Sequence, residues 1–203
     1  MVSLFYRRRK KLHKKIKASL IEKYTEKHRK YHNLNHIEQM FSLANELNLQ
    51  LTKPQTLAVL YHDSIYDPSS SINEENSCEF MYQDSPEEDR MDLDIAEYII
   101  LKTKSHKRTQ LKSADIILDL DMSCLGFDEI NYFSKYAKPV ILEYCQFFPF
   151  SKVLDGRKKF LEGLLNSDIF ITELFKQKFE KIARQNIKLE LEILNSNPES
   201  MIH

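Results

Sequence analysis

The adjacent residues His62 and Asp63 carry the strongest chemical signal in the sequence. They close the apolar stretch LAVLYHDSIYD, which is typical of a helix. Burying an imidazole and a carboxylate there is costly unless both have partners. A divalent metal suits both groups, because imidazole binds Fe, Mn, Co, Ni or Zn and carboxylate binds the harder ions of that set. On its own, a His–Asp dipeptide is more often a satisfied helix-end pair, so its neighbours decide the question.

Two further histidines precede this pair. His32 and His36 lie four residues apart in YHNLNHIEQM, and residues with that spacing share one face of a helix. Both could therefore reach one ion. If His32 precedes the helix proper, only His36 fits as a ligand, and His32 caps the loop or faces a substrate.

Carboxylates and one histidine follow the pair. The apolar segment ADIILDLDMSCLG carries Asp115, Asp119 and Asp121. Asp119 and Asp121 are two residues apart on a helix, so they cannot both face the protein core. At most one of them is expected to be a ligand. His106 lies among lysines in KTKSHK. Alone it would be a surface histidine, but beside a metal site it becomes a candidate phosphate binder or ligand of a second metal.

The elements that must position these residues are predicted to be helices. The chain has 203 residues, of which 42% are hydrophobic and 30% charged, with only 3 Gly and 6 Pro. Such a composition favours long helices with short loops and an all-α fold. We predict one helical domain over residues 1–203: a basic N-terminal helix at 1–30, a metal-site core at about 31–125, and C-terminal helices at about 127–195. The alternative is a core at about 25–125 with a separate helical C-terminal lobe.

Capping signals refine the boundaries. Thr52 is a plausible N-cap with Pro54 in the first turn. Ser113 is expected to cap a helix from Ala114 to Cys124, and Gly126 to end it as the residue after the C-cap. The other helices are expected at His36–Leu47, to about Ile65 after Thr52, at Glu74–Tyr82, Leu93–Lys102, Phe127–Cys145 with a kink at Pro139, Ser151–Leu165 and Thr172–Leu194.

The net charge is zero, but the charge is unevenly distributed. Residues 7–17 are strongly basic, whereas residues 84–94 are acidic. The basic run is typical of a solvated helix face, the alternative being a surface that binds nucleic acid or anionic lipid. No aromatic residues interleave with it, which disfavours nucleic acid. Three cysteines without a disulfide or zinc pattern, no signal peptide and no membrane span favour the cytoplasm.

The ordered motifs resemble a known family. One histidine, then His-Asp, then a distant Asp is the pattern of the HD superfamily of metal-dependent phosphohydrolases. The match includes YHNLNHI, YHDSIYDP, NEENS, TKSH, DLDMSCLG and ARQNIKLEL, which together resemble a bacterial branch of predicted HD phosphohydrolases. The resemblance spans roughly Tyr31 to Leu191 and implies an HD-domain-like helical bundle.

The resemblance also implies a ligand set. His36 takes the first position because it opens HIEQMFSLANEL, His62 and Asp63 form the catalytic pair, and Asp121 matches the final aspartate, with Asp119 in reserve. In such sites the four side chains hold one metal and leave room for water and a phosphate oxygen. Two-metal members place the pair's aspartate between the ions, so His106 could complete a second site here.

Other side chains are expected to surround this centre. Asn73 and Glu74 could orient water or a ligand, but Asn73 is equally suited to be a helix N-cap with Glu74 in the first turn. Lys104 could hold a phosphate as a point charge. Arg184 lies on a long helix that could close the pocket, and its alternative is a structural pair with Glu180.

The sequence thus predicts a metal-dependent hydrolase of a phosphate ester, on a nucleotide-like small molecule, with Mn, Fe, Co, Ni, Mg or Zn as cofactor. There is no GYP-type extension and no ordered set of arginines for a triphosphate, so the prediction names a reaction and leaves the substrate and oligomeric state open. One rival is a non-catalytic signalling protein that binds metal or nucleotide on the same scaffold. Another makes the basic N-terminal helix the functional part.

Overall fold

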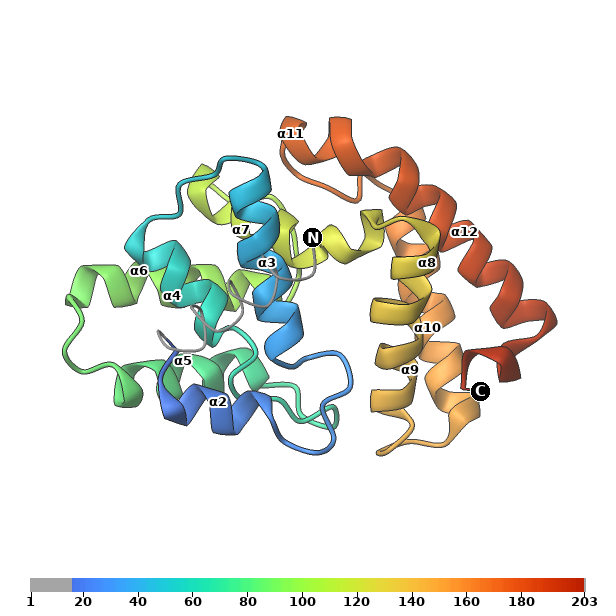
Figure 1. Cartoon of the computed structure of the whole chain (residues 1–203), viewed down its shortest axis with the longest axis horizontal. Helices are drawn as coiled ribbons and strands as arrows, with labels where there is room; N and C mark the ends of the chain where they lie inside the picture. Colours follow the sequence, from blue (N-terminus) through green and yellow to red (C-terminus); the bar gives the residue numbers. More distant parts are fainter. Residues whose placement is uncertain (1–15, 203) are drawn as a thin grey trace, which may run out of the picture. The chain divides into compact units, whose positions relative to one another are not determined.

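The computed structural model describes residues 16–202, and these form helices and loops without any strand (Figure 1). This confirms the predicted all-α fold. Within the described residues, no helix combines the length and apolar character needed to cross a membrane. The chain divides into two compact units, up to Lys104 and from Ser105 onward. The boundary falls inside the predicted core at 31–125, and the single-domain organisation stays a prediction.

The first unit contains five helices among its described residues. Its main helices start and end within about three residues of their predicted bounds, except that the helix after Thr52 ends earlier. The helix predicted at Leu93–Lys102 begins earlier, at Arg90. The helices are α2 (Ala18–Tyr24), α3 (Leu34–Glu46), α4 (Lys53–Tyr61), α5 (Asn73–Asp84) and α6 (Arg90–Thr103).

Side chains fix the starts of α3 and α4. The Asn33 side chain accepts a hydrogen bond from the amide of Asn35, and this bond caps α3. Thr52 caps α4 as predicted, and the side chain of Gln55 accepts a bond from the Thr52 amide, which completes a capping box. These caps set the register of the two helices that carry His36 and His62.

Among the described residues, the predicted basic helix at 1–30 is confirmed at Ala18–Tyr24 and wrong beyond Tyr24. Its part at 1–15 lies outside the described residues. Helix α2 ends at Tyr24, and the Thr25 hydroxyl turns back to the carbonyl of Ile21. The following turn leads the buried side chain of Arg29 inward, which a continuous exposed helix would not do.

Helix α4 is the centre of the first unit. It packs against α5 and α6 and has little amphipathic character, as expected of a helix that is buried on most sides. Ala58 and Val59 are completely buried, as are Ile99 and Ile100 of α6. The end of α4 therefore delivers His62 directly into the core.

In the second unit, α-helices alternate with short 3-10 or π segments. Its elements are α7 (Lys112–Asp121), a 3-10 segment (Met122–Gly126), α8 (Glu129–Tyr132), a π segment (Phe133–Ala137), α9 (Lys138–Tyr144), α10 (Phe150–Leu165), α11 (Glu173–Phe175), a π segment (Lys176–Glu180), α12 (Lys181–Ser196) and a 3-10 turn (Pro198–Met201). The predicted irregularity at Pro139 appears as the π segment before it. A proline ring cannot fit an uninterrupted α-helix, because it lacks the N–H and clashes with the carbonyl four residues earlier.

Both predicted caps of α7 are wrong. The N-cap is Leu111, without a side-chain bond, and Ser113 lies inside the helix. Gly126 ends the 3-10 segment and does not adopt the left-handed conformation of a C-terminal glycine. Its role is a close approach, because a Cβ atom there would lie 2.6 Å from Cβ of Phe179.

A buried ion pair joins α10 to α12. Arg157 donates to both carboxylate oxygens of Glu190, at 2.8 and 3.0 Å, and also to the Tyr136 hydroxyl at 3.0 Å. Tyr132 donates to the same carboxylate. A paired geometry of this kind satisfies charges that would otherwise be costly to bury.

Candidate metal centre

Two helices of the first unit place the predicted histidines. His36 lies in the first turn of α3, and His62 is the residue that follows the last turn of α4. Both are buried, with 3% and 2% of their surface exposed. Asp63 comes next in the chain, and 19% of its side chain remains exposed. The carboxylate therefore lies between the buried imidazoles and the solvent.

The three side chains converge. The Nε2 atoms of His36 and His62 lie 3.2 Å apart. Oδ2 of Asp63 lies 3.0 Å from Nε2 of His62 and 3.9 Å from Nε2 of His36. Adjacent donors around an ion with bonds of about 2.1 Å are roughly 3 Å apart. The separations of 3.2 and 3.0 Å match those of adjacent donors on one ion, whereas the 3.9 Å between Asp63 and His36 is longer.

The outer nitrogens of both imidazoles have partners. Nδ1 of His62 lies 3.1 Å from the carbonyl of Val59, which can only accept a hydrogen bond. A neutral His62 ring would thus carry its proton on Nδ1, which leaves the lone pair of Nε2 facing Asp63 and His36. Nδ1 of His36 lies 3.2 Å from the hydroxyl of Tyr31. Such contacts orient ligand histidines and fix their tautomers.

Arg29 links the two ligand-bearing segments. Its side chain is wholly buried, and its guanidinium donates to the carbonyls of His32 at 3.0 Å, Asp63 at 2.6 Å and Ser64 at 3.0 Å. The same group pairs with Glu26 at 2.9 Å. Sequence reasoning missed Arg29, because nothing in EKHRKYHN separates it from the neighbouring lysines.

The donor set has the chemistry of a divalent metal site. Two neutral imidazoles and one carboxylate suit Mn, Fe, Co, Ni or Zn. Two Nε2 lone pairs at 3.2 Å would repel each other unless a cation or a proton lies between them. The Asp63 side chain is 19% exposed, so this donor is the one that solvent reaches.

The predicted aspartates of the second unit have different environments. Asp119 is almost fully buried and accepts hydrogen bonds from the amides of Ile171 and Thr172 and from the Thr172 hydroxyl. Burial raises the pKa of Asp119, although these bonds favour its charged form. Its carboxylate anchors a loop. Asp121, the last residue of α7, is partly exposed, and its Oδ2 lies 2.8 Å from Nε2 of His106.

His106 has a backbone conformation that is rare for its type. Its φ is 48°, in the left-handed region that non-glycine residues seldom adopt. This conformation accompanies the contact of its imidazole with Asp121. His106 and Asp121, which were both predicted to belong to a metal site, are therefore paired with each other in the second unit.

The remaining candidates of the first unit have mainly structural contacts. Asn73 is the first residue of α5 rather than its N-cap, because its amide group instead bonds both the N–H and the carbonyl of Asp67. Nζ of Lys104 lies 2.8 Å from Glu75 and 3.5 Å from Glu74. The phosphate contact predicted for Lys104 and the roles predicted for Asn73 and Glu74 stay predictions.

His32 and Arg184 complete the set. The ring of His32 stacks on Tyr66, with 4.1 Å between ring centroids. Arg184 forms the predicted structural pair with Glu180, with Nε 2.8 Å from Oε1, and also donates to the carbonyl of Leu165. Glu180 in turn accepts from the amides of Ile169 and Phe170. Arg184 thus supports the same loop that Asp119 anchors.

Comparison with known proteins found no matching family model, curated protein or solved structure.

Proposed function

We propose that the chain is a metal-dependent phosphohydrolase of the HD superfamily, with His36, His62 and Asp63 among its metal ligands. The convergence of their three donor atoms carries this proposal. Residues 26 positions apart in sequence bring two lone-pair nitrogens and a carboxylate to one point. The order of the motifs is the second support, since the resemblance assigns these same residues.

The imidazoles and the carboxylate have different roles in the proposed site. A divalent ion bound here would polarise a phosphoryl oxygen and lower the pKa of a bound water toward neutrality. The Val59 carbonyl can only accept from Nδ1 of His62, which leaves Nε2 of that ring available to the ion, and Nδ1 of His36 would donate to the Tyr31 hydroxyl when its Nε2 binds the ion. Asp63 supplies negative charge on the partly exposed side, where a phosphate ester would enter.

The resemblance adds Asp121 as the fourth ligand and His106 as a candidate for a second metal or the phosphate. Asp121 fits this role better than Asp119 does, because both carboxylate oxygens of Asp119 accept hydrogen bonds from the Ile171–Thr172 segment. The contact between His106 and Asp121 matches the way an outer residue orients a ligand carboxylate.

We expect the substrate to be a small phosphate ester of nucleotide type. Two neutral imidazoles and carboxylates leave a bound divalent ion open to an anionic oxygen donor. The three cysteines are all free, which fits a reducing, cytoplasmic location.

The test compares wild type with His62→Ala and Asp63→Ala in phosphate release from a panel of nucleotides and simple phosphate esters, each with Mn, Co, Ni, Fe(II), Mg and Zn. We expect metal-dependent turnover that falls at least about a thousandfold in both variants, a loss of roughly 4 kcal/mol of transition-state stabilisation. Metal content should fall with it, and helical circular dichroism should not.

Asp155→Ala is the matched control, because Asp155 is an exposed carboxylate of α10. It should keep full activity. Wild-type turnover in both site variants would refute the assignment. Metal binding that is lost in both variants, with no turnover of any ester by wild type, would favour the non-catalytic binding protein instead.

A further inference from the structure

The zero net charge of the chain conceals two opposite regions. Residues 1–17 contain eight lysines and arginines and no acidic residue. Residues 73–104, which span α5 and α6, contain ten acidic residues against three basic ones. We call the face formed by α5, α6 and the loop between them the acidic face. Charge separation of this size within one unit favours contact between the two regions.

The last lysine of the basic run already contacts the acidic face. Nζ of Lys17 lies 2.7 Å from Glu87 and donates to the Asp84 carbonyl and the Ser85 hydroxyl at the end of α5. Lys17 also lowers the pKa of Glu87 by this hydrogen bond. The preceding residues therefore leave the described part of the chain directly beside the acidic face.

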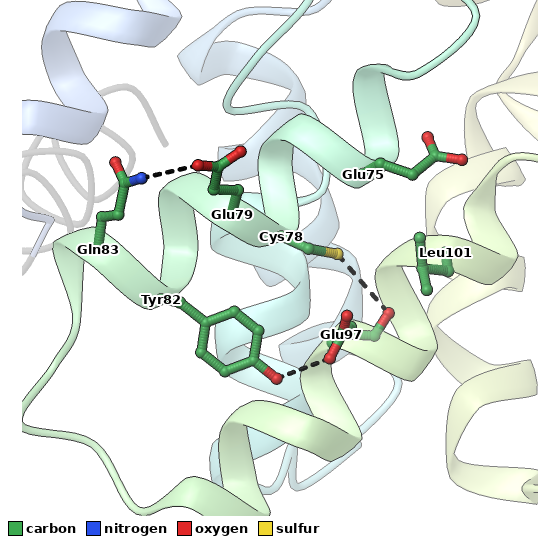
Figure 2. A pocket seen from close by; sticks show the side chains of 7 residues that line it. All are labelled: Glu75, Cys78, Glu79, Tyr82, Gln83, Glu97 and Leu101. Atoms are coloured by element: carbon green, nitrogen blue, oxygen red, sulfur yellow. Dashed lines mark hydrogen bonds between the residues drawn. The ribbon is translucent and has the colours of Figure 1, made fainter.

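A hollow of about 470 Å³ lies on this face between α5 and α6 (Figure 2). Its apolar lining includes Cys78 and Leu101, and its carboxylates are Glu75, Glu79 and Glu97. Figure 2 shows Tyr82 of α5 directed at Glu97 of α6, with the hydroxyl donating to that carboxylate at 2.7 Å. The hollow thus combines apolar side chains with carboxylates, and we call Glu75, Glu79 and Glu97 its rim.

Two carboxylates of the rim are not neutralised by a basic side chain of the described residues. Among residues 16–202, no basic side chain forms an ion pair with Glu79 or Glu97, whose hydrogen bonds come from Gln83 and Tyr82. Asp94 shares the Tyr82 hydroxyl with Glu97, so two carboxylates compete for one proton. A cationic side chain arriving at this rim would be attracted by unneutralised carboxylates.

We propose that residues 7–15 of this chain dock on the acidic face, continuing the contact that Lys17 begins. Arg7, Arg8, Arg9, Lys10 and Lys11 would reach the rim of the hollow, and Lys14 and Lys15 the end of α5. Reach is not limiting, since 15 residues can span about 50 Å and α5 is only about 18 Å long. Docking pairs these basic side chains with carboxylates, so they would no longer attract nucleic acid or anionic lipid.

Carbodiimide cross-linking tests this, because the reagent joins a lysine amine to a carboxylate only when the two are in contact. The full chain is treated at low salt, and the linked peptides are identified by mass spectrometry. We expect links from Lys10, Lys11, Lys14 or Lys15 to carboxylates within residues 73–104. The Lys17–Glu87 pair supplies a built-in positive control.

Two perturbations sharpen the result. Glu79→Lys should lower the yield of links from residues 10–15 several-fold, whereas Glu162→Lys, on an exposed position of α10, should not. Salt at 1 M, where the screening length is about 3 Å, should lower the same links several-fold.

Formation of the Lys17–Glu87 link without any link from residues 10–15 to the acidic face would overturn the proposal. A mixture of isotopically light and heavy chains separates the remaining occupants. Links between light and heavy chains would show that the segment docks on a second copy and would refute docking within the chain. Absence of the links, together with co-sedimentation on phosphatidylglycerol vesicles that requires residues 1–15, would assign the segment to a membrane surface.

Discussion

At the scale of single residues, Arg29 holds together the two segments that carry the proposed metal ligands. A guanidinium offers five donors in a fixed planar fork. Here three of its contacts are backbone carbonyls, those of His32, Asp63 and Ser64. Because the side chain is wholly buried, no water can replace these bonds without a structural change.

Replacing Arg29 with Ala should lower the free energy of unfolding by about 3 kcal/mol, because it leaves buried acceptors unpaired. Arg29→Lys should recover only part of this loss, since one ammonium cannot reproduce the planar fork. Urea denaturation measures the stability, and titration calorimetry should show weakened metal binding in both variants. The control is Arg90→Ala, whose side chain is 75% exposed, and stability of Arg29→Ala equal to this control would contradict the role.

Asp119 and Asp121 should respond differently to removal. Asp119→Ala leaves the amides of Ile171 and Thr172 without their acceptor, and we expect a loss of about 3 kcal/mol in stability. Asp121→Ala should instead weaken metal binding by at least about tenfold, with a smaller change in stability.

Denaturation and metal titration of the two variants give the comparison. Hydrogen exchange should also accelerate at residues 169–172 in the Asp119 variant alone. The reverse pattern, with metal affinity lost only in Asp119→Ala, would move the fourth ligand to Asp119.

At the scale of elements, an ion pair ties the start of α5 to the end of α6. Lys104 bonds Glu75 through a side-chain hydrogen bond, which lowers the pKa of Glu75 and raises that of Lys104. Both groups are exposed, so solvent screens the pair and its contribution is small. The predicted phosphate contact of Lys104 would have to compete with this carboxylate.

The pair gives a definite pH dependence. The stabilisation by Glu75 is complete above its ordinary pKa of 4.5 and is lost as pH falls through its lowered folded value. That of Lys104 is complete below 10.5 and is lost as pH rises through its raised value. Glu75→Gln should therefore melt slightly below wild type at pH 7, and the difference should disappear in acid. A difference that grows as pH falls would contradict this account.

The elements differ in how far the sequence predicts them. The start of α4 was predictable because Thr52 and Pro54 act through local bonds and backbone angles. The caps of α7 were not, because Gly126 is required by contact with Phe179, 53 residues away in sequence. The inward turn of Arg29 after α2 was not predictable either, because two of its acceptors, the carbonyls of Asp63 and Ser64, lie beyond α4. Long-range contacts of this kind leave no local signal.

At the scale of the whole molecule, the chain has two compact units, and each has its own buried polar centre. The first contains His36, His62 and Asp63, and the second contains Arg157 and Glu190. That His36, His62 and Asp63 come together could be predicted, because histidine and aspartate in this order are typical of a metal site. The ion pair of the second was not, because lysine, arginine and glutamate are frequent throughout this sequence.

Metal should raise the thermal stability of the protein. An ion at 100 times its dissociation constant adds about 2.7 kcal/mol if it binds only the folded chain. We expect Mn or Co to raise the melting temperature of wild type, a chelator to reverse the change, and neither to affect His62→Ala. The scan is best followed by circular dichroism at 222 nm. Equal shifts in wild type and His62→Ala would place the ion elsewhere.

Arg29 is also expected to affect the rate at which the first unit unfolds. Its bonds to the Asp63 and Ser64 carbonyls close a chain segment of about 35 residues that contains α3 and α4, so we expect these bonds to form late in folding. Contacts that form after the rate-limiting step of folding slow unfolding more than they speed folding. Arg29 should therefore lengthen the lifetime of the folded first unit, and an Arg29→Ala chain should open sooner while folding at nearly the same rate.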